Sequence, residues 1–265
     1  MNVTLKNHVE VTKGNSPVVL GFPHTGTDIP ENIRAGLNET GQMLSDTDWH
    51  VHELYDGLLD NVTTIRTRIH RYVIDVNRDP KGQSLYPGQN TTELCPTTDF
   101  DGKSIYLDGR APHGDEIQAR CDRFHRPYHA ALESELDRIR SIHGFAILYD
   151  CHSIRSDIPF LFNGKLPDFN IGTNDATSCS PAIEKLVYNI CRDARGYTSI
   201  LNGRFKGGWT TRHYAAPDIQ TIQMELAQST YMQECPPWNR HEKKAARLRP
   251  HLANILNTLS QWRPQ

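Results

Sequence analysis

The sequence of 265 residues lacks an excess of charge of either sign and lacks long apolar runs. It has 29 Lys and Arg against 31 Asp and Glu, which leaves a formal net charge of −2. This balance gives no electrostatic reason to expect a nucleic acid or a membrane surface as a partner. No apolar run approaches the roughly 18 residues that a membrane-spanning helix needs. We therefore expect a soluble globular protein with no nucleic-acid partner and no membrane partner.

Cysteine is scarce and scattered along the chain. The six cysteines form no Cys-x-x-Cys pair, which argues against a zinc ribbon and against a thioredoxin-type motif. Residues 1–15 lack the basic start and apolar core of a secretory signal. Together these features predict a cytoplasmic protein whose thiols are reduced.

Several familiar catalytic motifs are also missing. The thermolysin-type zinc motif His-Glu-x-x-His does not occur, and neither of the two common glycine-rich phosphate loops is present. What the sequence does contain is thirteen histidines. Histidine is the commonest metal ligand and a frequent acid or base, so the positions of these residues are the first guide to function.

Apolar and amphipathic segments alternate along the chain without an internal repeat, so we expect one domain over residues 1–265. Short apolar or β-branched runs predict strands, and longer stretches with apolar residues at helical spacing predict helices. The expected strands are 16–22, 62–69, 71–76, 144–149 and 218–226, and the expected helices are 48–59, 115–142, 181–194 and 239–262. Pro127 and Pro250 predict kinks in two of these helices. The alternation favours a three-layer α/β/α sandwich around a mixed, largely parallel sheet.

One long segment, residues 79–114, has no regular pattern and is rich in Gly, Pro, Thr and Asp. It is too long for an ordinary connection between two elements. We expect an irregular excursion that serves as a lid or as a wall of a substrate site.

Two of the predicted strands end in loops that carry a histidine. His24 follows strand 16–22 in GFPHTGTDIP, and His152 follows strand 144–149 in LYDCHS. Asp150, two residues before His152, is suited to orient a nearby imidazole. Ligands of open α/β sheets bind beyond the carboxyl ends of the strands, and a catalytic zinc needs three protein ligands and one open position. The two histidines therefore predict a shared metal site.

The third metal ligand is less closely defined by the sequence. Asp48 in DTDWHVHELY is our first choice, and Asp46, His50 and Glu53 compete with it. Either aspartate could instead cap the predicted helix 48–59. We expect Zn²⁺, although two histidines and a carboxylate also suit another divalent transition metal such as iron, manganese or cobalt.

Glu225 lies near the end of the predicted strand DIQTIQMEL. Alternation places its side chain on the same face as those of Thr221 and Gln223, next to apolar surroundings. A carboxylate in such surroundings has a raised pKa and can act as the general base on a water that a metal activates.

Arginine outnumbers lysine by 20 to 9, and arginine binds carboxylates through two parallel hydrogen bonds. In RYVIDVNRDP, Asn77 and Arg78 follow the predicted strand 71–76. A second group surrounds two glycines in NGRFKGGWTTRHYAAP, where a small anion can approach the backbone closely. The members of this second group are Arg204, Lys206, Arg212 and His213.

Seven segments occur in series between about residue 20 and about residue 232. They are PHTGTDIP, DTDWHVHELYD, RYVIDVNRDP, LYDCHS, LPDFNIGT, GRFKGGWTTRHYAAP and QMELAQSTYM. Together they resemble the N-formylglutamate amidohydrolase (N-formylglutamate deformylase) family. The resemblance implies a fold similar to that of the zinc carboxypeptidases (phosphorylase/hydrolase-like). It also implies a zinc-dependent amidase of histidine catabolism that hydrolyses N-formyl-L-glutamate to formate and L-glutamate.

The resemblance also implies roles for individual residues. His24 and His152 become metal ligands and Glu225 becomes the general base. The Asn77-Arg78 pair is similar to the pair with which carboxypeptidases hold a substrate carboxylate. In the carboxypeptidase pattern the carboxylate ligand comes three residues after the first histidine, where this chain has threonine, so Asp48 remains our choice.

In the implied reaction, Glu225 takes a proton from the attacking water and returns it to the departing amine, while Arg78 and the metal stabilise the negative oxygen. The substrate is a small dicarboxylate N-acyl amino acid, and its two carboxylates would be held by Arg204, Lys206 and Arg212, with His213 as a further contact. Two alternatives stay open. One is a related metal-dependent amidase or peptidase that acts on another N-acyl amino acid, and the other is a non-catalytic dicarboxylate-binding protein.

Overall fold

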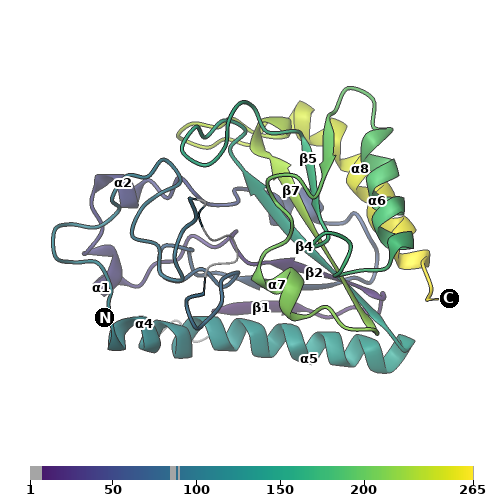
Figure 1. The fold of residues 1–265 in the computed structure, drawn as a ribbon, viewed down its shortest axis with the longest axis horizontal. Coiled ribbons are helices and arrows are strands. Elements are labelled where there is room, and N and C mark those ends of the chain that lie inside the picture. Colours follow the sequence, from purple (N-terminus) through teal and green to yellow (C-terminus); the bar gives the residue numbers. More distant parts are fainter. Residues whose placement is uncertain (1–7, 84–87, 89, 265) are drawn as a thin grey trace.

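The computed structural model of the protein describes residues 8–83, 88 and 90–264. Within these residues the strands form one seven-stranded sheet (Figure 1). The strands are β1 (Val9–Thr12), β2 (Val18–Phe22), β3 (Thr63–Thr67), β4 (Ala146–Ile154), β5 (Phe169–Gly172), β6 (Ser199–Leu201) and β7 (Ile219–Ala227). Their order across the sheet is β1-β3-β2-β4-β7-β5-β6. The β1–β3 and β5–β7 pairs are antiparallel and the other neighbouring pairs are parallel, so the predicted mixed, largely parallel sheet is confirmed.

Helices cover both faces of this sheet. They are α1 (Glu31–Arg34), α2 (Glu39–Gln42), α3 (Val51–Tyr55), α4 (Asp115–Arg120), α5 (Arg126–His143), α6 (Pro181–Arg192), α7 (Trp209–His213) and α8 (Glu242–Gln261), with a π-helical turn at Cys121–His125 and a 3₁₀ turn at Gln228–Thr230. On one face, α3, α6 and α8 form a core that includes Leu248, Leu252 and Ile255. On the other face, α5 buries Leu132 and Leu136. Figure 1 shows α6 and α8 side by side and α5 along the lower edge of the molecule, as an α/β sandwich requires.

The three central strands β2, β4 and β7 are buried along their whole length. Parallel strands that are covered on both faces are expected to be apolar almost throughout, and this is why the sequence identified β2 and the first half of β4 readily. β7 instead carries buried polar residues, including Thr221, Gln223 and Glu225. The longest pairing joins β4 to β7 from Ala146 opposite Ile219 to Ile154 opposite Ala227. This register places His152 directly opposite Glu225.

The prediction of a strand at residues 71–76 is wrong. These residues form turns, although Tyr72, Val73, Ile74 and Val76 are almost fully buried. Their apolar character reflects packing into the same core as Ile65 of β3. Because they form no strand, their buried backbone groups need hydrogen bonds from outside the sheet.

Other element boundaries also differ from the sequence prediction. The helix expected at 48–59 is reduced to α3, because His50 before it and Gly57 after it adopt left-handed φ angles of 60° and 68°. The terminal helix begins at Glu242 and continues through Pro250. The short strands β1, β5 and β6 were not predicted, since runs of three or four residues give little periodicity.

The long helix predicted at 115–142 exists, but its irregularity lies before Pro127 and not at it. A π-helical turn at Cys121–His125 separates α4 from α5, and Pro127 occupies the first turn of α5. Proline lacks an N–H and its ring clashes with the carbonyl four residues earlier, so a wider turn before it removes both conflicts.

Part of the predicted excursion at 79–114, namely residues 84–87 and 89, lies outside the described residues. The other residues of the segment include only isolated β-bridges, such as Leu37 with Tyr106 and Thr98 with Ser104. In the part of the chain that the structure describes, no helix is long and apolar enough to cross a membrane.

Candidate metal centre

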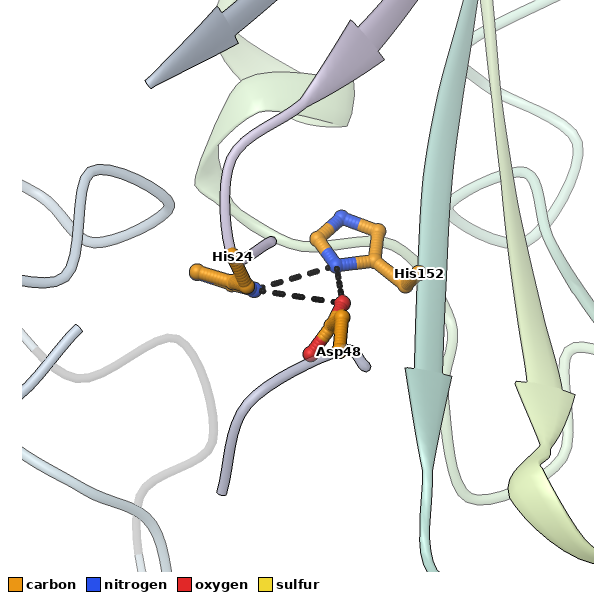
Figure 2. A group of neighbouring side chains, drawn as sticks. All are labelled: His24, Asp48 and His152. Carbon is orange, nitrogen blue, oxygen red and sulfur yellow. Dashed lines mark hydrogen bonds and ion pairs between the residues drawn. The ribbon is translucent and has the colours of Figure 1, made fainter. Parts of the chain in front are cut away.

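His24, Asp48 and His152 converge at the carboxyl ends of β2 and β4. Figure 2 shows the three side chains pointing toward one another, with His152 on its strand and the other two on loops. The Nδ1 atoms of the two histidines are 3.2 Å apart, and Asp48 Oδ2 lies 3.7 Å from His24 Nδ1 and 3.3 Å from His152 Nδ1. All three residues are buried, and their three facing atoms lie within 4.8 Å of one another. The structure thus brings together the three residues that the sequence put forward as metal ligands.

Backbone contacts place Asp48 in this group. Its N–H donates to the carbonyl oxygen of His24 at 3.0 Å, and its Oδ2 accepts from the N–H of Ser153 at 3.1 Å. The loop that carries Asp48 is therefore tied to the ends of both strands.

The three competing candidates point elsewhere. Asp46 Oδ2 accepts from the N–H of Phe100 at 2.9 Å. His50 Nε2 donates to the carbonyl oxygen of Trp238 at 2.8 Å, and the side chain of Glu53 is 45% exposed. Among the four acidic and histidine candidates of this segment, the geometry favours Asp48.

The outer nitrogen of each imidazole faces a buried carboxylate. His24 Nε2 donates to Asp75 Oδ1 at 2.7 Å, and His152 Nε2 lies 3.0 Å from Asp150 Oδ2. A proton held on Nε2 leaves the lone pair of Nδ1 directed at the centre, which is the arrangement that metal-binding histidines need. Asp150 therefore occupies the orienting position that the sequence suggested, whereas the contact of Asp75 was not foreseen.

Ionisation in the centre is dominated by these carboxylates. Burial alone would raise the pKa of Asp48, but hydrogen bonds with His152 and His24 outweigh it and hold that pKa below its usual range. Burial alone would lower the pKa of His152, but Asp150 and then Asp48 raise it well above its usual value. The first shift favours the ionised carboxylate of Asp48, and the second shows that the surrounding carboxylates stabilise positive charge at the histidines. Two imidazole nitrogens and one carboxylate oxygen are a donor set of catalytic zinc, so the residues present fit such an ion.

Glu225 stands beside this group on β7. Its side chain is buried, and Gln223 Nε2 donates to its Oε2 at 3.2 Å. Burial is the main cause that raises the pKa of Glu225 to about 8. A carboxyl group with this pKa can take up a proton near neutral pH and release it again.

A cavity of about 620 Å³ contains the three residues of the metal group together with Glu225. Its walls include described parts of the 79–114 segment, namely residues 79–83, 90–95 and 112–114. This segment therefore forms a wall of the site. The size of the cavity suits a small molecule.

Asn77, Arg78 and Arg204 all line this cavity. Asn77 Nδ2 lies 3.2 Å from His152 Nε2, and its Oδ1 accepts from the N–H of Thr210 at 2.8 Å. Arg78 donates from Nε to the carbonyl oxygen of Thr92 and from Nη2 to its hydroxyl, each at 3.0 Å.

Arg204 lies at another wall of the cavity. It donates from Nε to the carbonyl oxygen of Leu161 at 3.1 Å, and its guanidinium lies over the ring of Phe205. Together with a bond from Nη2 to the carbonyl oxygen of Asn90 at 3.1 Å, these contacts hold the guanidinium group itself at the cavity wall.

Lys206, Arg212 and His213 are not brought to the cavity: of the described residues that line it, none is one of these three. Lys206 Nζ pairs with Asp175 Oδ2 at 3.0 Å. Arg212 Nε donates to the carbonyl oxygen of Gly207 at 3.2 Å, and the His213 ring stacks on Trp209 at 4.1 Å. Closeness in sequence to Arg204 did not place these side chains on one surface, because the chain turns between them.

Gly208 lines the cavity, and its lack of a side chain has a role beyond the one expected from the sequence. A Cβ on Gly208 would overlap the side-chain amide of Asn77. The absence of a side chain at Gly208 therefore lets Asn77 reach its position beside His152.

Arg71 is a cavity residue that our sequence reasoning missed. Only 5% of it is exposed, its guanidinium contacts His24 Nδ1, and Nη2 lies 3.6 Å from Asp75 Oδ2. Burial alone would lower the pKa of Arg71, but Asp75 and then Asp48 raise it, so the group stays charged. The available signal was a cation and an acid, Arg71 and Asp75, four residues apart within an otherwise apolar stretch.

Comparisons with known proteins agree with this site. Two curated relatives are both named N-formylglutamate deformylase, one from Pseudomonas putida and one from Pseudomonas aeruginosa. They are 44% and 41% identical to this chain over 253 residues, which cover 94% of this chain and 94% and 95% of the relatives.

Solved structures give the same relationship. The crystal structure of N-formylglutamate amidohydrolase from Ralstonia eutropha JMP134 matches with a TM-score of 0.79 and 26% identity, covering 96% of this chain and 97% of that one. A gene product from Agrobacterium tumefaciens shares the fold, with a TM-score of 0.71 and 17% identity over 95% of this chain and 94% of that one. A family model described as N-formylglutamate amidohydrolase matches residues 16–232. The chain therefore belongs to the N-formylglutamate amidohydrolase family.

Proposed function

We propose that this protein hydrolyses N-formyl-L-glutamate to formate and L-glutamate, as its family and the names of its relatives suggest. One observation carries the proposal. The β4–β7 register holds Glu225 opposite His152, so that a carboxyl group with a raised pKa and the His-Asp-His group share one cavity.

His24, Asp48 and His152 would hold a divalent ion, for which Zn²⁺ is our choice. When bound, such an ion lowers the pKa of water toward about 7 and polarises a carbonyl. Asp75 and Asp150 keep the two imidazoles oriented for this task.

Glu225 is the proposed general base. It would accept a proton from the attacking water and deliver it to the amine nitrogen as the formyl C–N bond breaks. Its buried surroundings favour the protonated form that the second step requires.

Two cavity arginines are suited to different negative charges. Arg71 contacts His24 Nδ1, so it is well placed for the oxygen that becomes negative on the formyl carbon. Arg78 was our first candidate for that role. Its bonds to Thr92 and its position next to Asn77 support the binding of a substrate carboxylate better.

Arg204, on another wall, would bind the second carboxylate of the substrate. This leaves Lys206, Arg212 and His213 without a part in our proposal. A role in histidine degradation belongs to the same proposal, and a cytoplasmic location remains a prediction from the sequence.

The proposal is tested by measuring formate or acetate release from N-formylglutamate, N-formylaspartate and N-acetylglutamate. We expect a clear preference for N-formylglutamate, because both the length of the dicarboxylate and the size of the acyl group must fit the cavity. Equal rates on all three would contradict the specific substrate and would favour a broader N-acyl amidase. No release from any of them, together with tight binding of N-formylglutamate, would favour a dicarboxylate-binding protein.

A second measurement tests the metal. A strong chelator should abolish hydrolysis, and Zn²⁺ should restore it. Unchanged hydrolysis after metal analysis has shown the ion to be gone would contradict a metal-dependent mechanism.

A further inference from the structure

The segment that carries Asn77 and Arg78 is not part of the sheet. Its backbone is held by single main-chain bonds, such as that from the N–H of Asp75 to the carbonyl oxygen of Leu94 at 2.7 Å, and by side chains. His129 Nε2 donates to the carbonyl oxygen of Val76 at 2.7 Å. His125 Nε2 donates to the carbonyl oxygen of Arg78 at 3.0 Å. The two histidines therefore hold the peptide group before Asn77 and the peptide group after Arg78.

A third donor holds the same segment further upstream. Arg120 Nη1 donates to the carbonyl oxygen of Val73 at 3.1 Å. Arg120, His125 and His129 all come from the long helical run formed by α4, the π-helical turn and α5, which lies along the lower edge of Figure 1. One continuous run thus supplies three of the groups that fix residues 73–78.

The π-helical turn explains how these three side chains reach one segment. In a regular α-helix, residues five apart point about 140° away from each other, whereas residues four apart nearly align. A π-helical turn bonds residues five apart and so brings them to the same face. Arg120 and His125 are five apart across this turn, and His125 and His129 are four apart beyond it.

Ring contacts hold both histidines in the orientation in which they donate to the two carbonyl oxygens. Their rings lie 4.4 Å apart, and the ring of Trp209 covers them at 5.5 Å from His125 and 4.7 Å from His129. Both are buried, and burial lowers both pKa values, that of His129 to about 3. A neutral imidazole whose Nε2 donates to a carbonyl has one defined tautomer, so the contact is specific in direction.

We propose that His125 is a positioning residue for Arg78, and that the π-helical turn, which also accommodates Pro127, directs His125 to the Arg78 carbonyl. The proposal rests on the proposed function, in which Arg78 binds a substrate carboxylate. Paired hydrogen bonds to a carboxylate need an accurately placed guanidinium. Losing the His125 contact would let the Arg78 backbone shift and would weaken substrate binding, while Glu225 and the metal group stay in place.

The test is a double-mutant cycle of His125→Leu with Arg78→Met. Each protein is assayed for kcat and KM on N-formylglutamate and, by calorimetry, for the Kd of the product L-glutamate. We expect His125→Leu to raise KM and Kd about tenfold and to change kcat by less than about twofold, as loss of one orienting hydrogen bond predicts. We expect the double variant to bind no more weakly than Arg78→Met alone, because His125 acts through Arg78.

Two further variants separate positioning from general damage. His125→Gln keeps an N–H donor and should recover most of the affinity. His143→Leu removes a similar bond from the end of the same helix, where His143 Nε2 donates to the carbonyl oxygen of Asn15 at 2.7 Å, and should leave KM and Kd unchanged. If His125→Leu does not fold, His125→Met takes its place in the cycle.

The outcomes are distinct. Unchanged KM and Kd in a folded variant without a donor at 125, or additive losses in the double variant, would overturn the positioning role. Failure of the wild-type protein to hydrolyse N-formylglutamate would instead overturn the proposed function. The Kd values for L-glutamate would still decide the role of His125.

Discussion

At the scale of single residues, the metal centre is defined by which atom of each side chain faces inward. Asp75 lies next to Nε2 of His24, and Asp150 lies next to Nε2 of His152. The Nδ1 atoms of both histidines therefore face Asp48. Each carboxylate that takes part is almost fully buried. Substitutions at these buried carboxylates should therefore change either turnover or metal binding, depending on which carboxylate is replaced.

Glu225→Gln should retain the metal and lose about 10²–10⁴-fold in kcat, because the amide has nearly the same shape but cannot accept the proton. The measurement is kcat together with metal content of the purified variant. Wild-type turnover in a metal-loaded Glu225→Gln protein would remove Glu225 from the mechanism.

Asp48→Asn should weaken metal binding strongly. Loss of an outer carboxylate partner typically costs about 10–100-fold in metal affinity, so loss of an inner ligand should cost at least as much. Glu53→Gln, in the same segment but exposed, is the matched control and should keep its metal. Metal content after dialysis distinguishes them, and equal retention by both would point to a different third ligand.

At the scale of elements, the site depends on close approaches between neighbouring segments. Gly208→Ala would place a methyl group against the Asn77 amide and push it away from His152. A shift of about 1 Å in a positioning residue can lower kcat/KM by about 100-fold. We expect a loss of this order with little change in Tm.

The control for this prediction is Gly36→Ala, whose added Cβ would meet its nearest atom at 3.3 Å, away from the site. It should leave kcat/KM nearly unchanged. Equal effects of the two substitutions would show that the Gly208–Asn77 contact has no special importance.

The helix α5 should also make stability depend on pH through His129. Burial lowers the pKa of His129 to about 3, whereas the unfolded chain has the ordinary value near 6.5. Below pH 6.5 the unfolded chain gains a proton that the folded protein does not, so the free energy of unfolding falls by up to about 1.4 kcal/mol per pH unit until about pH 3. Above pH 6.5 this contribution is constant.

Urea denaturation at pH 7, 6 and 5 tests this dependence. His129→Gln should be less stable at pH 7, because it disturbs a buried hydrogen bond, but its stability should fall less steeply with acid. His143→Gln, on the same helix and more exposed, should keep the wild-type slope. If the stability of His129→Gln falls with acid as steeply as that of the wild type, His129 is not the source of the pH dependence.

At the scale of the whole molecule, the metal group connects distant parts of the chain. His24, Asp48 and His152 come from two loops and a central strand. An ion that binds only the folded protein stabilises it by about 4 kcal/mol at a free concentration 1,000 times its Kd. We expect Zn²⁺ to raise Tm and a chelator to lower it, as scanning calorimetry would measure. A Tm that does not depend on the metal would contradict the assigned ligands.

Much of the architecture follows from the sequence alone. The central strands at 16–22, 144–149 and 218–226 and the long helix near 115–142 were identified because burial on both faces or on one stripe produces a local pattern. His24 and His152 were found for a related reason, since residues at the carboxyl ends of parallel strands meet at one edge of the sheet.

Only the tertiary structure decided the rest of the site. It favoured Asp48 over Asp46 as the third member of the metal group. It also placed Arg71 in the cavity wall and paired Lys206 with Asp175 outside the cavity. It also showed that residues 71–76 are held by turns, single main-chain bonds and side chains, and not by a sheet. The physical reason is that residue type and periodicity are local properties of the chain. The direction of a side chain on a loop depends instead on the packing and hydrogen bonds of residues far away in sequence.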